Sequence, residues 1–269
     1  MTRPPADAGT GFHATTMQDL PALVTFLDRA CAQVGADADA TSAIRLATEE
    51  VLSNILRHGY GNRPGAVTIR VDAAPEQIIV TLVDAAPAFD PGSVATPDRG
   101  AGWAERRIGG LGWHLVHQVM DEVRRESGAQ GGNVFTLIKK RVTHPSDILD
   151  KQEENRLMEI EIQPGEHAAV VVIAGSVDGL TAETLLATLQ GYIDAGHTRL
   201  VADLERVDYT SSAGLRALLA TVKQTRQRGG DLRLASINPQ VLKVLELSGF
   251  TTILKCYDDV ASAMDSYAA

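Results

Sequence analysis

The spacing of apolar residues predicts a first region that alternates helices and strands. DLPALVTFLDRACAQVG has helical spacing, and a second helix should run from an N-cap at Asp39 to about His58. Alternating apolar positions at 66–72 and 77–84 predict a hairpin of two strands. LGWHLVHQVMDEV is again helical in spacing, and NVFTLIKKR predicts a closing strand. We therefore expect a two-layer α/β sandwich, with helices against a mixed or antiparallel sheet.

A second region follows a polar break. The segment VTHPSDILDKQEENR contains a proline and clustered charges, whereas the strand patterns MEIEIQ and AAVVVIAG come directly after it. Strands and helices then alternate to the C-terminus, which predicts a mixed, largely parallel sheet with crossover helices. We expect a flexible N-terminus at 1–16, a first domain at 17–141, a linker at 142–156 and a second domain at 157–269.

Composition narrows the classes of function. A chain of 269 residues with 44% hydrophobic and 22% charged residues suits two globular domains, and its net charge of −9 argues against direct nucleic-acid binding. The two cysteines, Cys31 and Cys256, form no CxxC pattern, so neither a disulfide framework nor a zinc site is indicated. The longest apolar run, 168–174, is too short to cross a membrane. We expect a soluble cytoplasmic protein with no membrane association.

The second predicted helix carries a polar stripe. Glu50, Asn54 and His58 follow at intervals of four residues, so they drift only about 80° around a helix. For each residue alone, a solvated helix face is the simpler interpretation. As a set they border the apolar side of the helix and could form a site. Glu49 lies on another face, and we expect it at the surface.

Two further features could bind a ligand. Asp84 ends a predicted strand, where it could form an Asx turn or accept a hydrogen bond from an exocyclic amino group. The glycines of Gly109-Gly110-Leu111-Gly112 lead into a helix, where backbone N–H groups could approach a phosphate, although such glycines also occur in simple hinges. Neither a P-loop nor a Rossmann motif is present.

The order of these motifs resembles a known family. ATEEVLSNILRHGY, LVDAAPAFDP, IGGLGWHLVHQVMDEV and GGNVFTLIKKR follow one another as in the anti-sigma factor serine kinases of the GHKL ATPase superfamily, over about 17–141. The resemblance implies a kinase that uses ATP and Mg²⁺ and forms a homodimer through this domain.

The resemblance also implies roles for individual residues. Glu50 matches the acid that polarises the attacking group, and Asn54 matches the Mg²⁺ ligand. Asp84 matches the acid that reads adenine. The remaining matches are Gly110 and Gly112 around the phosphates, Arg106 and Arg107 as lid residues that neutralise the transferring phosphoryl group, and Thr136 beside adenine.

The chain departs from this family at two positions. The family has D-x-G where this chain has Asp84-Ala85-Ala86, so a glycine that permits a positive φ or a close approach of adenine is lost. A methyl group there would weaken nucleotide binding without abolishing it. The family's tyrosine after MDEVR is Arg125 here, which we expect to affect packing or a partner surface.

The second region resembles a STAS domain, the fold of anti-sigma factor antagonists, over about 157–269. IAGSVD, LVADLERVDYTSSAGLRALL and VLKVLELSGF carry the resemblance. Alignment on the following Gly-Leu pair places the phosphoacceptor at Ser212, while Ser211 takes a position usually held by Asp. Simple N-capping of the helix by the serine pair is the competing interpretation. A phosphate on an exposed hydroxyl at this helix N-terminus would be stabilised by the helix dipole.

These observations lead to one hypothesis and its rivals. We expect an ATP-dependent serine kinase fused to a STAS antagonist domain, which regulates transcription by phosphorylation-controlled partner switching. Its partners would be a STAS antagonist, in cis or in trans, and a sigma factor or another regulated protein. The alternative is a non-catalytic scaffold with a degraded nucleotide site. A third possibility keeps ATP binding and gives the STAS domain a ligand-sensing role.

Overall fold

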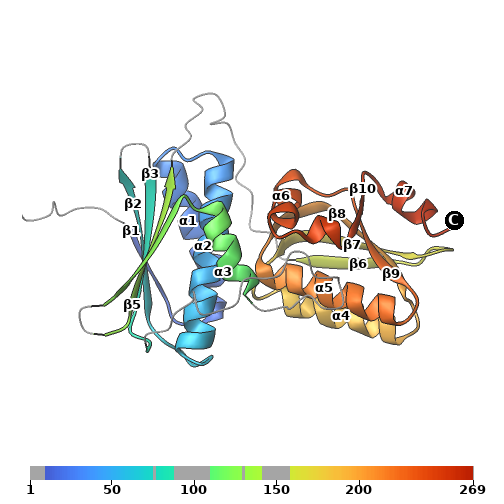
Figure 1. The fold of residues 1–269 in the computed structure, drawn as a ribbon, viewed down its shortest axis with the longest axis horizontal. Coiled ribbons are helices and arrows are strands. Elements are labelled where there is room, and N and C mark those ends of the chain that lie inside the picture. The colour runs from blue at the N-terminus through green and yellow to red at the C-terminus, as the bar shows by residue number, and fades with distance from the viewer. Residues whose placement is uncertain (1–9, 75–76, 88–109, 129–130, 141–157, 269) are drawn as a thin grey trace, which may run out of the picture. The chain divides into compact units, whose positions relative to one another are not determined.

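The computed structural model describes residues 10–74, 77–87, 110–128, 131–140 and 158–268. These residues form two compact units, one mainly from the first 150 residues and one mainly from residues 151–269 (Figure 1). Each unit contains its own five-stranded sheet. The predicted linker at 142–156 lies outside the described residues. No helix in the described ranges is long and apolar enough to cross a membrane.

The sheet of the first unit is antiparallel throughout. Its strand order is β1-β2-β3-β5-β4, and the strands are β1 (Thr10–Ala14), β2 (Val67–Ala74), β3 (Gln77–Asp84), β4 (Glu122–Ser127) and β5 (Asn133–Lys140). Alternate residues of β2, β3 and β5 are buried. This alternation is the pattern of a sheet that has one face covered, and the predicted sandwich is confirmed.

Helices cover one face of this sheet (Figure 1). α1 (Leu20–Gln33) packs beside α2 (Ala38–Asn54), and α2 contacts β3 and β5. A short 3-10 helix, η1 (Met17–Asp19), precedes α1, and a π-helix, η2 (Ile55–Gly59), extends α2. α3 (Leu111–Val119) leads into β4, and Lys139 of β5 donates a hydrogen bond to the Val119 carbonyl at its end.

Two strands of this sheet were not predicted. Thr10–Ala14 falls in the segment expected to be a flexible N-terminus, yet it pairs with β2 as an edge strand. The helical spacing of LGWHLVHQVMDEV continues past the real end of α3 at Val119, so the predicted helix included the first two residues of β4 and the rest of this strand was not predicted. Both strands lie at sheet edges. β1 has only five residues, and β4 carries polar residues on both faces, which hides the alternation that identifies a strand.

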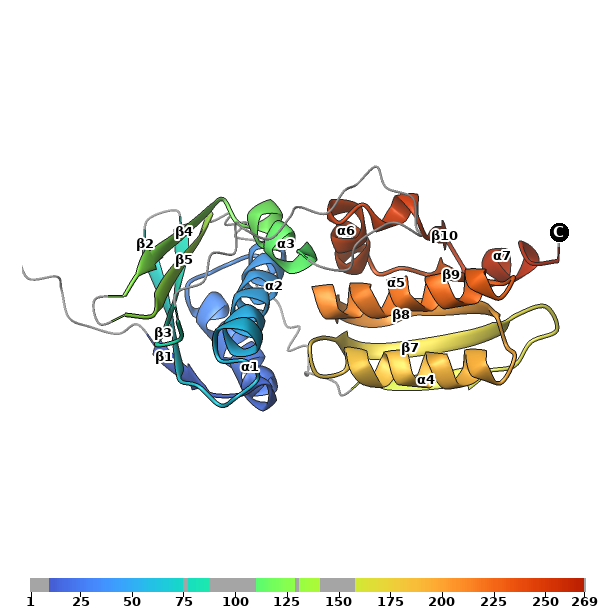
Figure 2. The same cartoon turned by 60° about the horizontal axis from the view of Figure 1, so that its bottom comes forward.

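The second unit has a mixed sheet, as predicted. Its order is β10-β9-β8-β7-β6; only β6 runs antiparallel to its neighbour. Helices flank the sheet (Figure 2). The elements are β6 (Glu159–Gln163), β7 (Ala169–Val177), α4 (Ala182–Asp194), β8 (Arg199–Thr210), α5 (Ser212–Gln227), β9 (Asp231–Ala235), α6 (Pro239–Leu247), η4 (Phe250–Thr252), β10 (Lys255–Tyr257) and α7 (Val260–Asp265).

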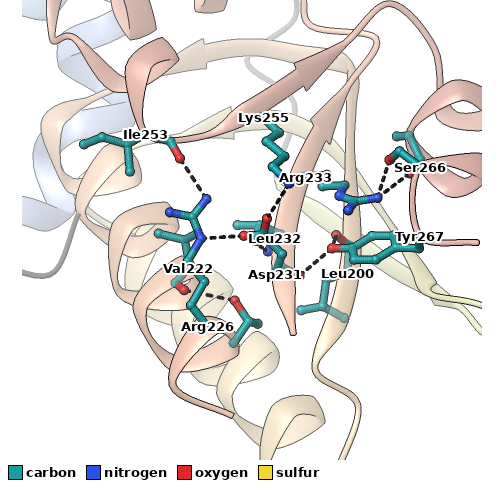
Figure 3. Close-up of polar contacts among 12 residues, drawn as sticks. Leu200, Val222, Arg226, Asp231, Leu232, Arg233, Ile253, Lys255, Ser266 and Tyr267 are labelled. Carbon is teal, nitrogen blue, oxygen red and sulfur yellow. Dashed lines mark hydrogen bonds and ion pairs between the residues drawn. The ribbon is translucent and has the colours of Figure 1, made fainter. Parts of the chain in front are cut away.

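A polar cluster joins β9 to its neighbours (Figure 3). Asp231 forms an ion pair with Arg226 of α5, with 2.7 Å between Oδ1 and Nε, and its Oδ2 lies 3.8 Å from Nζ of Lys255. The Tyr267 hydroxyl donates to the Asp231 carbonyl at 2.6 Å, and the Arg233 guanidinium stacks 3.5 Å from the centre of the Tyr267 ring. These contacts fasten the C-terminal segment to the sheet.

Candidate functional site

The polar stripe of α2 has a different shape from the one predicted. The helix is capped by Asp37, whose side chain accepts from Ala40 N at 2.7 Å, and not by Asp39. Glu50 is buried and Asn54 is half-buried on this α-helix. Beyond Asn54 the chain forms the π-helix η2, which has more residues per turn, so His58 leaves the stripe and is exposed. The structure therefore groups Glu50 with Asn54 only.

Glu49 was expected at the surface, and this prediction is wrong. Its side chain is only 3% exposed, close to the 4% of Glu50. The reason is that α2 packs against the sheet on one side and against α1 on another, so little of its circumference reaches solvent. Two neighbouring carboxylates are thus buried on the same turn of α2, ahead of Asn54.

Asp84 lies at the end of β3 and has one open acceptor. Its Oδ1 accepts from the backbone N of Ala86 at 2.8 Å and from Nδ2 of Asn133 at 2.9 Å. The residue is only 5% exposed, yet its buried Oδ2 has no hydrogen-bond partner among the described residues. Burial raises the pKa of the Asp84 carboxyl, against the opposing effect of hydrogen bonds from Asn133 and Ala86 and of the charge of Arg125. Such a group suits a ligand donor.

The strand register corrects the prediction for Thr136. Asp84 of β3 pairs with Asn133 of β5, whereas Thr136 pairs with Thr81. Because side chains alternate along a strand, Thr136 points to the face of the sheet opposite Asp84. The residue beside Asp84 is therefore Asn133, which is fully buried. We call Asp84 and Asn133 the candidate base site, because Asp84 is the acid predicted to read the adenine base. Sequence reasoning missed it because the register of β3 against β5 was not considered.

The substitution at Ala86 is accommodated by a glycine on η2. Ala86 is buried, and its φ is not positive, so the backbone there does not require glycine. A Cβ added at Gly59 would lie 2.8 Å from the Ala86 Cβ, so the absence of a side chain at Gly59 leaves room for this methyl group. The Ala86 N–H still binds Asp84. This hydrogen bond helps to hold the Asp84 carboxylate in place.

The glycine-rich entry to α3 is described only in part. Gly110 has a φ of +80°, which favours glycine, and its carbonyl accepts from His114 N as the first bond of the helix. Gly112 lies in the first turn of α3. The predicted lid residues Arg106 and Arg107 lie outside the described residues.

Ser212 is the first residue of α5, and its surroundings differ from those expected. Ser211 is the N-cap, because its side chain accepts from Ala213 N at 3.2 Å. Ser212 is fully buried, not exposed as predicted, and its Oγ accepts from Nη1 of Arg216 at 2.9 Å. A Cβ at Gly214 would approach the Val177 carbonyl to 2.8 Å, so α5 packs tightly against the end of β7 and draws this turn inward.

The described residues contain no group of three or more His, Cys, Asp or Glu side chains that could hold a metal. An Mg²⁺ ion held by one amide and by the phosphates of a nucleotide would not require such a group. Asn54, the predicted Mg²⁺ ligand, is half-buried on α2.

Comparison with known proteins identifies both units. Residues 13–139 match the family of histidine kinase-like ATPase domains, and residues 158–263 match the STAS domain family. BtrV of Bordetella bronchiseptica, named as an anti-sigma factor antagonist, is 42% identical over 37% of this chain and 83% of its own length. The anti-sigma F factor antagonist of Paenibacillus polymyxa is 26% identical over 40% of this chain and 94% of its own.

Solved structures give weaker matches. An anti-sigma factor antagonist from Mycobacterium paratuberculosis has 21% identity and a TM-score of 0.40, covering 42% of this chain and 96% of that one. The family matches and the 42% identity to the Bordetella protein place this chain in the family of STAS-domain anti-sigma factor antagonists, with a histidine kinase-like ATPase domain preceding the STAS domain.

Proposed function

We propose that the chain is an ATP-dependent serine kinase of the anti-sigma factor type, fused to a STAS antagonist domain and controlling transcription by phosphorylation-dependent partner switching. The open Oδ2 of Asp84 is the observation that carries the proposal. A buried carboxylate oxygen without a donor is costly, and the exocyclic amino group of adenine supplies such a donor. The match to histidine kinase-like ATPase domains supports ATP as the nucleotide.

The kinase chemistry is assigned to α2. Asn54 offers an amide oxygen to Mg²⁺, which shields the charge of the phosphates when it is bound. Glu50 accepts the proton of the attacking serine hydroxyl as the bond from serine oxygen to the γ-phosphorus forms and the bond to the leaving ADP oxygen breaks. The N–H groups at the start of α3, after Gly110, bind phosphate oxygens. Arg106 and Arg107 balance the charge on the transferring group.

Ser212 is the proposed acceptor, on this chain or on another copy. Its hydroxyl is held by Arg216, one turn along α5, and a phosphate on Ser212 would find the same cation within reach. Because Ser212 is buried, the first turn of α5 must open before the hydroxyl can react. The added charge would then prevent the tight return of this turn and change which partner binds.

The proposed partners follow from the names of the relatives. The Bordetella and Paenibacillus proteins are named as antagonists of anti-sigma factors, so the STAS domain is proposed to bind an anti-sigma factor or a kinase of that type. The ATPase domain is proposed to form a homodimer and to engage a sigma factor or another regulated protein. Cytoplasmic location is part of the same proposal.

Transfer of labelled phosphate tests the kinase. Incubation of the full chain with γ-labelled ATP and Mg²⁺ should label the wild type and leave Ser212→Ala unlabelled. Glu50→Gln should bind ATP with unchanged affinity but transfer phosphate about 10²- to 10⁴-fold more slowly, because the general base is lost. Phosphate transfer at the wild-type rate by Glu50→Gln would show that Glu50 is not the general base. Undiminished labelling of Ser212→Ala would show that Ser212 is not the phosphoacceptor.

Calorimetry separates this proposal from the scaffold alternative. A nucleotide-binding enzyme should give measurable heat with Mg²⁺–ATP. No heat at millimolar nucleotide would favour a non-catalytic docking protein. The accommodation of Ala86 against Gly59 argues for an intact site.

A further inference from the structure

Arg125 is placed where it can act on the candidate base site. It lies on β4, the edge strand beside β5, and is half-buried. Its Nη2 donates to the side-chain Oδ1 of Asn133 at 3.0 Å. The neighbouring arginine, Arg124, points to the other face of the sheet and pairs with Glu122. Arg125 therefore turns toward Asp84, whereas Arg124 does not.

The contact fixes the orientation of the Asn133 amide. An asparagine side chain has one acceptor oxygen and one donor nitrogen, which can exchange places by a flip. Arg125 can only donate, so it requires Oδ1 on its side. The Nδ2 group then faces Asp84 and donates to its Oδ1 at 2.9 Å. A flipped amide would set an oxygen against a carboxylate and a nitrogen against a guanidinium.

The fixed amide in turn fixes the carboxylate. Oδ1 of Asp84 receives two donors, from Asn133 and from the Ala86 backbone, so the plane of the carboxyl group is held and Oδ2 is left as the open acceptor. We propose that Arg125 is a positioning residue for the nucleotide base, which acts through Asn133 to aim Oδ2 of Asp84 at the exocyclic amino group of adenine. This inference rests on the proposed ATP binding.

The charge of Arg125 adds a second effect in the same direction. Burial favours the neutral form of Asp84, and the nearby guanidinium opposes that pKa shift. An ionised carboxylate is the stronger acceptor for an amino group. Loss of Arg125 would thus loosen the amide and weaken the acceptor, without removing any atom that touches the nucleotide.

A comparison of two nucleotides tests whether Arg125 acts on the base through Asn133 and Asp84. Affinities for ATP and for purine riboside triphosphate, which lacks the amino group, are measured by calorimetry on the full chain. In the wild type, loss of the amino group should weaken binding about 10- to 100-fold, as expected for a hydrogen bond to a charged acceptor. In Arg125→Met that ratio should fall to about 3-fold or less, and in Arg125→Lys it should recover in part. Arg124→Met is the matched control and should keep the wild-type ratio.

The ratio distinguishes positioning from a structural role. If Arg125→Met weakens both nucleotides equally, or keeps the wild-type ratio, the proposal is overturned. If the wild type binds neither nucleotide, the proposed function fails and this inference fails with it. The Met side chain preserves the apolar stem on an edge strand, so we expect a folded variant. Arg125→Leu, which also removes the guanidinium and keeps an apolar side chain, supplies the same comparison should Arg125→Met not fold.

Discussion

Two buried aspartates, one in each unit, have opposite surroundings. Asp231 of the STAS domain is 9% exposed and its carboxylate binds Arg226, Lys255 and its own neighbour's backbone, Leu232 N. Asp84 of the ATPase domain is 5% exposed, yet its Oδ2 has no hydrogen-bond partner in the part of the chain that the structure describes. The fully bonded carboxylate is a structural element. The partly bonded carboxylate has a buried acceptor oxygen to which a ligand can donate a hydrogen bond.

The difference separates stability from function. A buried ion pair whose partners are all present is strongly destabilised when one member is removed, because a charge is left alone. A buried carboxylate with an open oxygen already carries that cost, and its removal should harm binding more than folding. The two residues should therefore respond to substitution in different assays.

The largest effect should follow from Asp231→Ala. Arg226 and Asp231 are both mostly buried, so loss of the carboxylate should lower the free energy of unfolding by about 3 kcal/mol. Urea unfolding followed by circular dichroism measures this change. The matched control is Asp194→Ala, which breaks an equally short but exposed pair with Arg228 and should cost less than about 1 kcal/mol. Equal losses in the two variants would contradict the distinction.

A smaller effect, on nucleotide affinity and not on stability, should follow from Asp84→Asn. The asparagine can still accept from Ala86 and Asn133, but it places a donor where Oδ2 stood. ATP affinity should fall about 10- to 100-fold. The free energy of unfolding should decrease by no more than about 1 kcal/mol. A variant that binds ATP normally, or one that unfolds as readily as Asp231→Ala, would break the comparison.

The smallest effect is a loss of ATP affinity caused by protonation of Asp84, which is absent at neutral pH and appears on acidification. Because burial raises the pKa of Asp84 above its ordinary value of 3.8, this carboxyl becomes neutral at a higher pH than an exposed aspartate. The neutral Asp84 carboxyl is favoured in the folded state. Its contribution to stability is therefore fully present below the ordinary pKa of 3.8 and is lost as the pH rises through the raised pKa of the folded protein. ATP binding changes in the other direction, because the neutral carboxyl is a poorer acceptor, so affinity falls as the pH drops.

Calorimetry at decreasing pH measures that loss of affinity. ATP also titrates in the acid range, so the meaningful quantity is the difference between the wild type and Asp84→Asn. That difference should shrink as the carboxyl becomes protonated. A difference that stays constant across the range would show that Asp84 remains ionised or does not touch the base.

The sequence predicted the elements better than their contacts. Helical and alternating spacing identified both sheets and the place of Asp84 at the end of a strand. Asn133 was missed because it lies 49 positions along the chain from Asp84, and only the strand register brings the two together. Arg125 was expected to affect packing or a partner surface, because its place on a strand beside β5 was not predicted. A register of β3 against β5, drawn from their apolar alternation, could have found Asn133, whereas Arg125 lies on β4, a strand that the sequence pattern did not reveal.

Other differences arise from local geometry that spacing does not encode. The stripe of Glu50, Asn54 and His58 assumed 3.6 residues per turn, and the π-helix changes that number after Asn54. The burial of Ser212 depends on Gly214, which lets α5 approach β7 closely. Neither feature alters the pattern of polar and apolar letters. For Ser212, a sequence argument can name the residue but not its accessibility.

The π-helix after Asn54 adds one residue to a helical turn, so the residues that follow are rotated about the helix axis relative to a continuous α-helix. Its closing bond joins Tyr60 N to the Ile55 carbonyl, five positions back, where an α-helix would use four. Deletion of one residue there would turn all that follows by about 100° around the helix axis. Gly59 would leave Ala86, and the Tyr60 hydroxyl would lose the Ala85 N–H beside Asp84. The extra residue thus sets the angular alignment between the helix that carries Glu50 and the turn that holds the base acceptor.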